Sequence, residues 1–161
     1  MKESVQVSVW CITYNHKRYI RRALDSMVAQ KTRFAYEVIV HDDASTDGTA
    51  EIVAEYAQKY PEKIIPVLEK ENQVSQGKNI TMDCFPKMAR GKYFALCEGD
   101  DYWIDDFKLQ KQYDYMEKHP NCTFCVHNAI VVNTQGKFLR DYITSHKSCK
   151  ISCRKVVRGG G

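Results

Sequence analysis

Short apolar runs alternate with amphipathic segments along most of the chain, and this order constrains the fold more than any other feature. The runs are rich in β-branched residues, which favour strands, and they lie at residues 5–12, 37–40, 64–68 and 92–97. Between and after them, apolar residues recur at the three- and four-residue steps of a helix face, at positions 20–28, 53–60 and 106–118. The alternation predicts an α/β fold, a three-layer sandwich with a mostly parallel central sheet and right-handed crossovers.

Two segments depart from this alternation. Residues 79–90 look helical, but Pro86 lies inside them, so we expect a helix that is interrupted or begins late. Residues 122–132 and 137–143 have the apolar pattern of strands, with a turn at Gly136 between them. We therefore predict two more strands after the last helix.

The charge of the chain is unevenly distributed. Its 161 residues include 24 basic and 20 acidic side chains, a net charge of +4. Five of the basic residues and no acid lie in residues 147–161, so the preceding 146 residues carry a net charge of −1. We predict one domain over residues 1–161 with a basic tail at 147–161. We expect no nucleic-acid partner, because nucleic-acid binders more often carry a basic face on the body of the fold.

The N-terminus bears on the cellular location. Residues 1–4 lead directly into the first apolar run, and no stretch of the chain approaches 18 consecutive apolar residues. The pattern of a secretory signal is missing there. We therefore expect a cytoplasmic protein without a membrane-spanning helix.

Seven cysteines are an odd number, which suits reduced thiols packed as small apolar side chains. The spacing of four of them is close to that of a zinc ribbon, with two histidines nearby: Cys122, Cys125, Cys149, Cys153, His127 and His146. In the strand predicted over residues 122–132, however, Cys122 and Cys125 would point to opposite faces. We expect free thiols, with structural zinc as the alternative.

An acidic turn follows the strand predicted at 92–97. Five carboxylates lie within residues 98–106, and such a row is costly unless a cation neutralises it. Asp100 and Asp101 have the hard oxygen ligands that Mg²⁺ or Mn²⁺ prefers. The next two acids, at positions 105 and 106, are expected to cap the following helix. Tyr102 and Trp103 either form a wall for a ring-shaped ligand or cap the core.

Polar residues also follow two other predicted strands, and in a parallel sheet these ends line the ligand crevice. Tyr14 follows the first strand, where its ring could stack on a base, and Asn15 could fix the loop by bonding its own backbone. Asp42 and Asp43 follow the second strand and could accept hydrogen bonds from a base or ribose. The alternative role for these acids is to cap the next helix, which residues 45–47 could do instead.

The usual glycine-rich phosphate loops are missing from the sequence, which suits a nucleotide diphosphate held by a metal. Three segments together resemble the family 2 glycosyltransferases of the GT-A fold. They are Thr-Tyr-Asn at 13–15, Val-Ile-Val-His-Asp-Asp-Ala-Ser-Thr-Asp-Gly-Thr at 38–49, and Gly-Lys-Tyr-Phe-Ala-Leu-Cys-Glu-Gly-Asp-Asp at 91–101. The resemblance covers residues 4–135, and three motifs in order are far more specific than any one alone.

The resemblance implies roles for the residues at these positions. Tyr14 matches the tyrosine that stacks on the nucleobase, and Thr13 and Asn15 flank it. Asp43 matches the acid that hydrogen-bonds the base, with Asp42 beside it. These five residues form the implied base-binding side of the donor site.

The phosphate side of the implied site is carried by other residues. Lys78 lies where the family often has an arginine near the pyrophosphate. Asp100 and Asp101 match the motif that binds the metal and the ribose, and Glu98 occupies the first position of its Asp-x-Asp form. The implied cofactor is Mn²⁺ or Mg²⁺, and the implied donor is a nucleotide-diphosphate sugar, expected to be a UDP-sugar.

The resemblance also implies the reaction. In the family, a carboxylate deprotonates the acceptor hydroxyl in a single inverting displacement while the metal stabilises the leaving nucleoside diphosphate. That base lies beyond the metal motif, where Asp141 is the one acid in a predicted strand. We therefore expect the base to lie beyond Gly161, and the domain to be C-terminally incomplete.

The form Glu-Gly-Asp-Asp-Tyr-Trp at 98–103 is similar to that of bacterial enzymes that build capsular, lipopolysaccharide or other surface glycans. The implied acceptor is a glycan or a lipid-linked glycan. The basic residues at 147–161 could contact anionic lipid at the inner face of the membrane, or they could be a solvated end of the chain. Two other functions remain open: a non-catalytic nucleotide-sugar-binding domain, and a phospho-acceptor domain built around Asp42 and Asp43.

Overall fold

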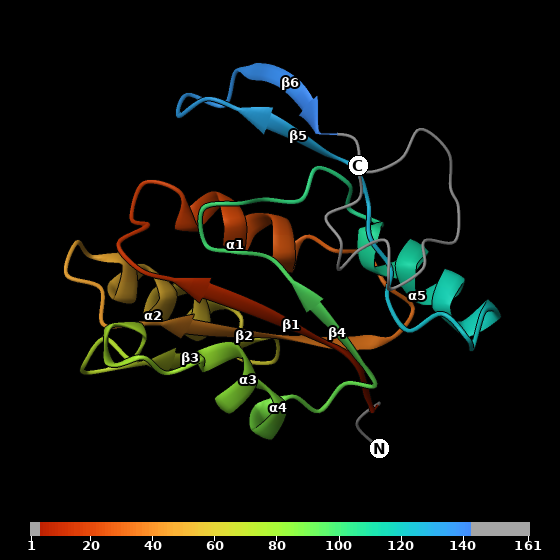
Figure 1. The fold of residues 1–161 in the computed structure, drawn as a ribbon, viewed down its shortest axis with the longest axis horizontal. Coiled ribbons are helices and arrows are strands. Elements are labelled where there is room, and N and C mark those ends of the chain that lie inside the picture. Colours follow the sequence, from red (N-terminus) through yellow and green to blue (C-terminus); the bar gives the residue numbers. More distant parts are fainter. Residues whose placement is uncertain (1–3, 143–161) are drawn as a thin grey trace. The chain divides into compact units, whose positions relative to one another are not determined.

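The computed structural model describes residues 4–142 (Figure 1). The chain divides into two compact units, Met1–Lys118 and His119–Gly161. The single domain expected over residues 1–161 stays a prediction. The basic tail at 147–161 lies outside the described residues.

The first unit is built on a four-stranded sheet in which every neighbouring pair of strands is parallel. Its strand order is β3-β2-β1-β4, and the strands are β1 (Val5–Thr13), β2 (Ala35–Asp42), β3 (Ile64–Leu68) and β4 (Tyr93–Leu96). Parallel neighbours need a crossover between them, and helices fill these connections. The predicted mostly parallel α/β sheet is therefore confirmed.

Helices cover both faces of this sheet, as Figure 1 shows. One face packs against the longer helices, α1 (Ile20–Val28), α2 (Thr49–Lys59) and α5 (Lys108–Lys118). The other face packs against the short α3 (Ile80–Asp83) and α4 (Phe85–Met88), which follow the 3-10 turn η1 (Val74–Gln76). The break between α3 and α4, with Pro86 in the first turn of α4, confirms the interruption expected within residues 79–90.

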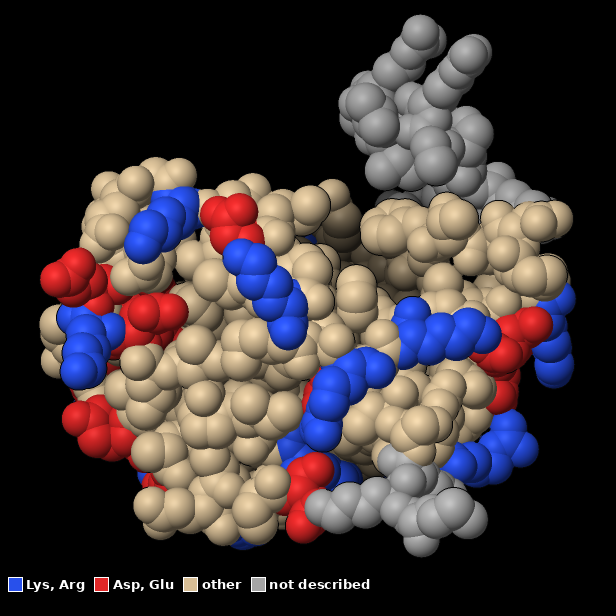
Figure 2. All heavy atoms as spheres, turned by 90° about the horizontal axis from the view of Figure 1, so that it is seen from below, with Lys and Arg blue, Asp and Glu red and all other residues tan. Residues whose placement is uncertain are grey.

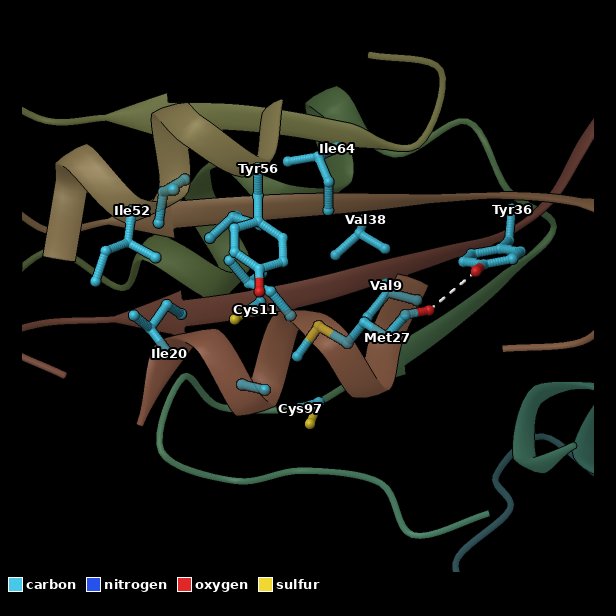
Figure 3. Close-up of a cluster of buried hydrophobic side chains, with 14 of the residues drawn as sticks. Val9, Cys11, Ile20, Met27, Tyr36, Val38, Ile52, Tyr56, Ile64 and Cys97 are labelled. Atoms are coloured by element: carbon cyan, nitrogen blue, oxygen red, sulfur yellow. Dashed lines mark hydrogen bonds between the residues drawn. The ribbon is translucent and has the colours of Figure 1, made fainter. Parts of the chain in front are cut away.

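The larger core lies between the sheet and the longer helices (Figure 3). The predicted apolar face of α1 is there: Ile20, Ala23, Leu24 and Met27 are completely buried. Burying each of the three larger side chains contributes about 1.5–3 kcal/mol. The hydroxyl of Tyr36 donates a 2.9 Å hydrogen bond to the carbonyl oxygen of Met27, so the strand and the helix are also joined by a polar contact.

The smaller core lies on the other face and is aromatic. The rings of Trp10 and Phe85 stack with their centroids 4.8 Å apart, beside the buried Ile39. The indole nitrogen of Trp10 donates to the hydroxyl of Thr81 at 3.2 Å. These contacts hold α3 and α4 on the sheet although each has only four residues.

Glu37 near the start of β2 is a buried charge with a complete set of partners. Its side chain is 1% exposed and accepts hydrogen bonds from the Ser8 hydroxyl at 2.7 Å and the Arg90 Nε at 2.6 Å. Burial opposes ionisation, but these donors outweigh it and lower the pKa of Glu37. Gly91, which follows Arg90 in the sequence, lies so close to β1 that a Cβ there would be 2.5 Å from the backbone nitrogen of Ser8.

His41 near the end of β2 is also buried, but its ring has no hydrogen-bond partner in the part of the chain that the structure describes. Its Nε2 lies 3.9 Å from Oδ1 of Asp43 and from Oε1 of Glu69, and neither ring nitrogen makes a hydrogen bond with the described residues. Burial lowers the pKa of His41 below its ordinary value of 6.5, although these carboxylates and Asp42 favour the charged form. Burial therefore favours the neutral form of His41.

On the face in Figure 2, basic and acidic side chains are interspersed. The described residues include several exposed ion pairs, such as Lys31 with Asp106 at 3.1 Å. Exposed pairs contribute little to stability, so the two cores and the Glu37 network carry most of it.

The second unit contains the antiparallel strands β5 (Ala129–Val132) and β6 (Phe138–Tyr142). The strand predicted at 122–132 therefore begins later, at Ala129, because residues 123–128 adopt no regular structure. Cys122 thus lies outside any strand, and placing Cys122 and Cys125 on opposite strand faces was wrong. The other residues of the zinc alternative, His146, Cys149 and Cys153, lie outside the described residues.

Substitution of Glu37 tests the buried network. We expect Glu37→Gln to lower the free energy of unfolding by about 2 kcal/mol, because one buried oxygen that accepts from Ser8 or Arg90 is replaced by an amide nitrogen that cannot accept. Urea denaturation at pH 7 measures the change. The matched control is Glu55→Gln, which removes the exposed ion pair of Glu55 with Arg21 and should have a much smaller effect. Equal losses in the two variants would contradict this role for Glu37.

The pH dependence of stability tests the environment of His41. The unfolded chain binds a proton near pH 6.5, whereas the folded chain resists it, so stability is lost as the pH falls below 6.5. The slope from one such group reaches at most about 1.4 kcal/mol per pH unit. We expect His41→Phe to remove this part of the slope between pH 7 and pH 5 in urea denaturation. The exposed His127→Gln should leave it unchanged, and an unaltered slope in His41→Phe would show that His41 does not titrate as described.

Candidate functional site

The polar residues predicted to form the site lie at the carboxyl ends of β1, β2 and β4. Thr13 and Asp42 are register partners at the ends of β1 and β2. The backbone N–H of Asp43 donates to the carbonyl of Thr13 at 3.0 Å, and that of Gly99 donates to the carbonyl of Ile12 at 2.8 Å. These backbone hydrogen bonds bring the three predicted clusters to one edge of the sheet.

The loop after β1 presents one aromatic ring to solvent. Tyr14 is 45% exposed, whereas the side chain of Thr13 is buried and its hydroxyl has no hydrogen-bond partner among the described residues. Asn15 has a positive φ of 55°. Its Oδ1 accepts from the backbone N–H of Thr46 at 2.9 Å, so Asn15 fixes this loop to the loop after β2. The sequence suggested instead that Asn15 would bond its own backbone.

Gly99 lies directly against the end of β1. A Cβ at this position would be 2.5 Å from the Thr13 hydroxyl oxygen and 3.0 Å from Nδ1 of His16. Only a glycine allows the acidic turn to approach β1 this closely. Thr13 therefore acts as a packing surface for the turn, and its side chain is less available to a ligand than the sequence suggested.

The two acids after β2 have different partners. Asp42 accepts from the backbone N–H of Ser45 at 2.9 Å through Oδ2, while its buried Oδ1 has no partner among the described residues. Asp43 accepts from the backbone N–H groups of Gln73 at 2.7 Å and Val74 at 3.1 Å. Both carboxylates are 1% exposed. Asp43 thus fastens the segment before η1 to the end of the sheet.

The capping of α2 is done by another residue. Oδ1 of Asp47 accepts from the backbone N–H of Thr49 at 3.0 Å and from its hydroxyl at 2.5 Å. The alternative in which Asp42 or Asp43 caps this helix is therefore wrong, and both acids remain available for other roles.

The acidic turn carries two exposed, adjacent carboxylates. Burial and the charge of Asp100 raise the pKa of Asp101, with His16 opposing this. Nε2 of His16 lies 3.9 Å from Oδ2 of Asp100. Two carboxylates that repel one another suit a divalent cation, which favours their charged forms. Within residues 4–142 no three His, Cys, Asp or Glu side chains form a metal site, so a cation here would take its other ligands from elsewhere.

The aromatic pair after these acids serves the fold and the neighbouring helix. Trp103 packs against the larger core, which is one of the two roles expected for it. The ring of Tyr102 lies against the Arg22 guanidinium, whose central carbon is 3.6 Å from the ring centroid. Tyr102 is therefore covered by a cation on one face.

The last two acids of the turn are structural. Asp105 accepts from the backbone N–H of Phe107 at 2.9 Å and pairs with Lys111 at 2.6 Å, which places it at the start of α5 as expected. Asp106 pairs with Lys31 instead of capping the helix through its side chain.

Lys78 lies on an exposed loop, and its ammonium group donates to Oε1 of Gln73. It is joined through this loop to Asp43. Among the described residues, no hydrogen bond or ion pair links these two side chains to Asp100 or Asp101. The described contacts therefore join Lys78 to Asp43 and leave the acidic turn after β4 as a separate group.

His41 and Gln73 were missed by the sequence reasoning. The position of His41 within an otherwise apolar run, directly before Asp42, was a usable signal. Gln73 had no such signal, because its neighbours form an ordinary polar loop.

No described helix is long and apolar enough to cross a membrane.

Comparison with known proteins identifies relatives of this chain. An uncharacterized protein of Mycobacterium tuberculosis (strain H37Rv) is 46% identical over 130 residues, which are 81% of this chain and 37% of that protein. The Bacillus subtilis protein TuaG, provisionally named a teichuronic acid biosynthesis glycosyltransferase, is 32% identical over 142 residues, which are 88% of this chain and 54% of TuaG. The chain thus spans about a third to a half of the length of these relatives.

Two solved structures have the same arrangement of elements. S. aureus TarS 1–349 in complex with UDP-GlcNAc is 30% identical, with a TM-score of 0.59 over 72% of this chain and 32% of that chain. The mannosyltransferase PcManGT from Pyrobaculum calidifontis, in complex with GDP-Man and Mn²⁺, is 25% identical, with a TM-score of 0.60 over 83% of this chain and 36% of that chain. The predicted GT-A type of α/β fold is therefore confirmed.

The sequence model of the family described as "Glycosyl transferase family 2" matches residues 8–155, which is most of the chain. The match contains all three motifs on which the resemblance was based. The chain therefore belongs to glycosyl transferase family 2.

Proposed function

We propose that this chain is the donor-binding part of a glycosyltransferase that transfers a sugar from a nucleotide-diphosphate sugar to an acceptor. The observation that carries this proposal is the meeting of Tyr14, Asp43 and the Asp100–Asp101 turn at one edge of a parallel sheet. An exposed ring suits the base, a buried carboxylate suits its polar edge, and an exposed acidic pair suits a divalent cation that binds the diphosphate. The ligands named for TarS and PcManGT support this class of donor.

The base side of the site would select the nucleotide. The exposed ring of Tyr14 offers a stacking surface, and ring stacking of this kind is tolerant of base identity. Each oxygen of Asp43 already accepts one backbone N–H and keeps a further lone pair. A carboxylate with only acceptors left favours a base that offers an N–H, such as uracil, so we propose a UDP-sugar as the donor.

The phosphate side would hold the metal. Asp100 and Asp101 are the residues that would bind Mn²⁺ or Mg²⁺, and Asp100 would also contact the ribose. The metal supplies charge stabilisation to the leaving nucleoside diphosphate. Lys78 would add a second positive charge near the diphosphate. His41 lies 3.9 Å from Asp43 without a hydrogen bond to it, so it occupies none of the lone pairs that Asp43 would offer to the base.

The acceptor and the catalytic base are further parts of this proposal. An inverting displacement needs a carboxylate near the acceptor hydroxyl, and we propose that this base lies beyond Gly161 in sequence. A surface polysaccharide or a lipid-linked glycan is the proposed acceptor, supported by the name of TuaG. The proposed location is the cytoplasm, at the inner face of the membrane.

A non-catalytic nucleotide-sugar-binding domain is the second candidate, favoured by one observation. Within residues 4–142, no acid downstream of the Asp100–Asp101 turn lies in the first unit's sheet. Hydrolysis or transfer of UDP-sugar by a longer protein with this sequence would exclude this candidate.

The metal proposal is tested by Asp101→Asn. We expect UDP to bind this variant at least about tenfold more weakly than wild type in the presence of Mn²⁺, because one charged ligand is lost. Titration calorimetry with and without Mn²⁺ measures the affinity. Asp106→Asn is the matched control from the same turn, and it should bind UDP as wild type does. Metal-independent binding that is equal in all three proteins would refute the metal role of Asp101.

The stacking proposal is tested at Tyr14. We expect Tyr14→Ala to weaken uridine binding about tenfold, since a base stacked on an aromatic ring gains about 1–3 kcal/mol. Tyr14→Phe keeps the ring and should bind uridine within about twofold of wild type. Competition against UDP in calorimetry gives both affinities. If the phenylalanine variant loses as much as the alanine variant, the hydroxyl and not stacking is what matters.

A further inference from the structure

The loop between β3 and α3 is held to the end of β2 by one acid. The carboxylate of Asp43 accepts from the backbone N–H groups of Gln73 and Val74, and the carbonyl of Asp43 accepts from Nδ2 of Asn72 at 3.0 Å. Three consecutive residues of the loop are thus bonded to Asp43. Because Asp43 is 1% exposed, this attachment is shielded from water and is strong for a surface loop.

Gln73 is the residue in which the hydrogen bonds of this loop meet. Its side-chain Nε2 donates to the carbonyl of Glu71 at 2.7 Å, and its Oε1 accepts from the ammonium of Lys78. Its own carbonyl accepts from the backbone N–H of Gln76 at 3.1 Å and that of Lys78 at 3.2 Å. Both the backbone and the side chain of Lys78 are therefore tied to Gln73.

The hydrogen-bond partner of the Lys78 ammonium is the neutral amide of Gln73, so the positive charge of Lys78 is not cancelled. No carboxylate lies within ion-pair distance of its ammonium among the residues that the structure describes. An amide oxygen holds the ammonium in place without cancelling its charge, and it occupies one of three N–H donors. The other two donors and the whole positive charge remain free for an anion.

We propose that Gln73 is a positioning residue that holds Lys78 for the diphosphate of the donor and couples it to the base-binding Asp43. This inference rests on the proposed function. The side chain of Gln73 restricts a long and flexible lysine before any ligand binds, so less conformational entropy is lost on binding. Gln73 itself touches neither the base nor the diphosphate.

The proposal predicts a selective defect. Gln73→Ala keeps the backbone N–H that Asp43 accepts and the carbonyl that accepts from Lys78, so the loop stays attached. The variant loses two side-chain contacts, the one that holds Lys78 and the one with the carbonyl of Glu71. We expect its affinity for UDP to fall about fivefold, while its affinity for uridine, which lacks phosphates, stays within about twofold of wild type.

The experiment measures UDP and uridine binding to five versions of the whole chain by titration calorimetry. They are the wild type, Gln73→Ala, Lys78→Ala, the double variant, and the control Gln76→Ala. Gln76 lies on the same loop, and its Nε2 donates to Oε2 of Glu71 at 3.1 Å, so its loss perturbs the loop without touching Lys78. Once Lys78 is replaced, Gln73→Ala should weaken UDP binding no further.

The outcomes separate this inference from the proposed function. A UDP-selective loss in Gln73→Ala that vanishes in the Lys78→Ala background supports the positioning role. Equal losses for UDP and uridine, additive losses in the double variant, or the same loss in Gln76→Ala would overturn it and leave the proposed function standing. A wild-type chain that binds neither UDP nor uridine, with or without Mn²⁺, would overturn both.

Discussion

The register of β1 against β2 is the constraint on which the rest of the site depends. It sets Thr13 beside Asp42 at the end of two buried parallel strands. A shift of one residue would turn every side chain of a strand to the opposite face, and the core would lose its apolar contacts. The energy that fixes the core thus also fixes the polar strand ends. The backbone bonds from Asp43 and Gly99 to β1 then add the remaining loops to the same edge.

The buried polar side chains at the two ends of β2 differ in how completely they are hydrogen-bonded. At its start, Glu37 has donors for both oxygens, which makes this end a stable closure of the sheet. At its other end, both ring nitrogens of His41 and one oxygen of Asp42 have no partner among the described residues. Unsatisfied buried groups cost stability, and natural proteins tolerate them chiefly at functional sites. The contrast therefore marks the carboxyl end of the sheet independently of any motif.

Much of the fold could be predicted from the sequence because it follows from periodic patterns. The face of α1 and the break at Pro86 were predicted from residue spacing and backbone chemistry. The late start of β5 could not be, since the apolar residues of 123–128 carry a strand-like pattern without pairing to a neighbour. In the site, residue types indicated Tyr14 and the acidic turn. The contacts of Gln73 and the burial of Thr13 depend on loops that meet only in the folded chain.

The attachment of the β3–α3 loop to Asp43 has a consequence for how such a chain can evolve. A carboxylate that fastens a loop and is also the proposed partner of the base cannot be exchanged without disturbing both tasks. A substitution at the exposed Tyr14 leaves the scaffold intact, but stacking there tolerates any base, so we expect it to change affinity more than nucleotide preference. Drift at Asp43 would need simultaneous compensation in residues 72–74, a case of epistasis imposed by three hydrogen bonds.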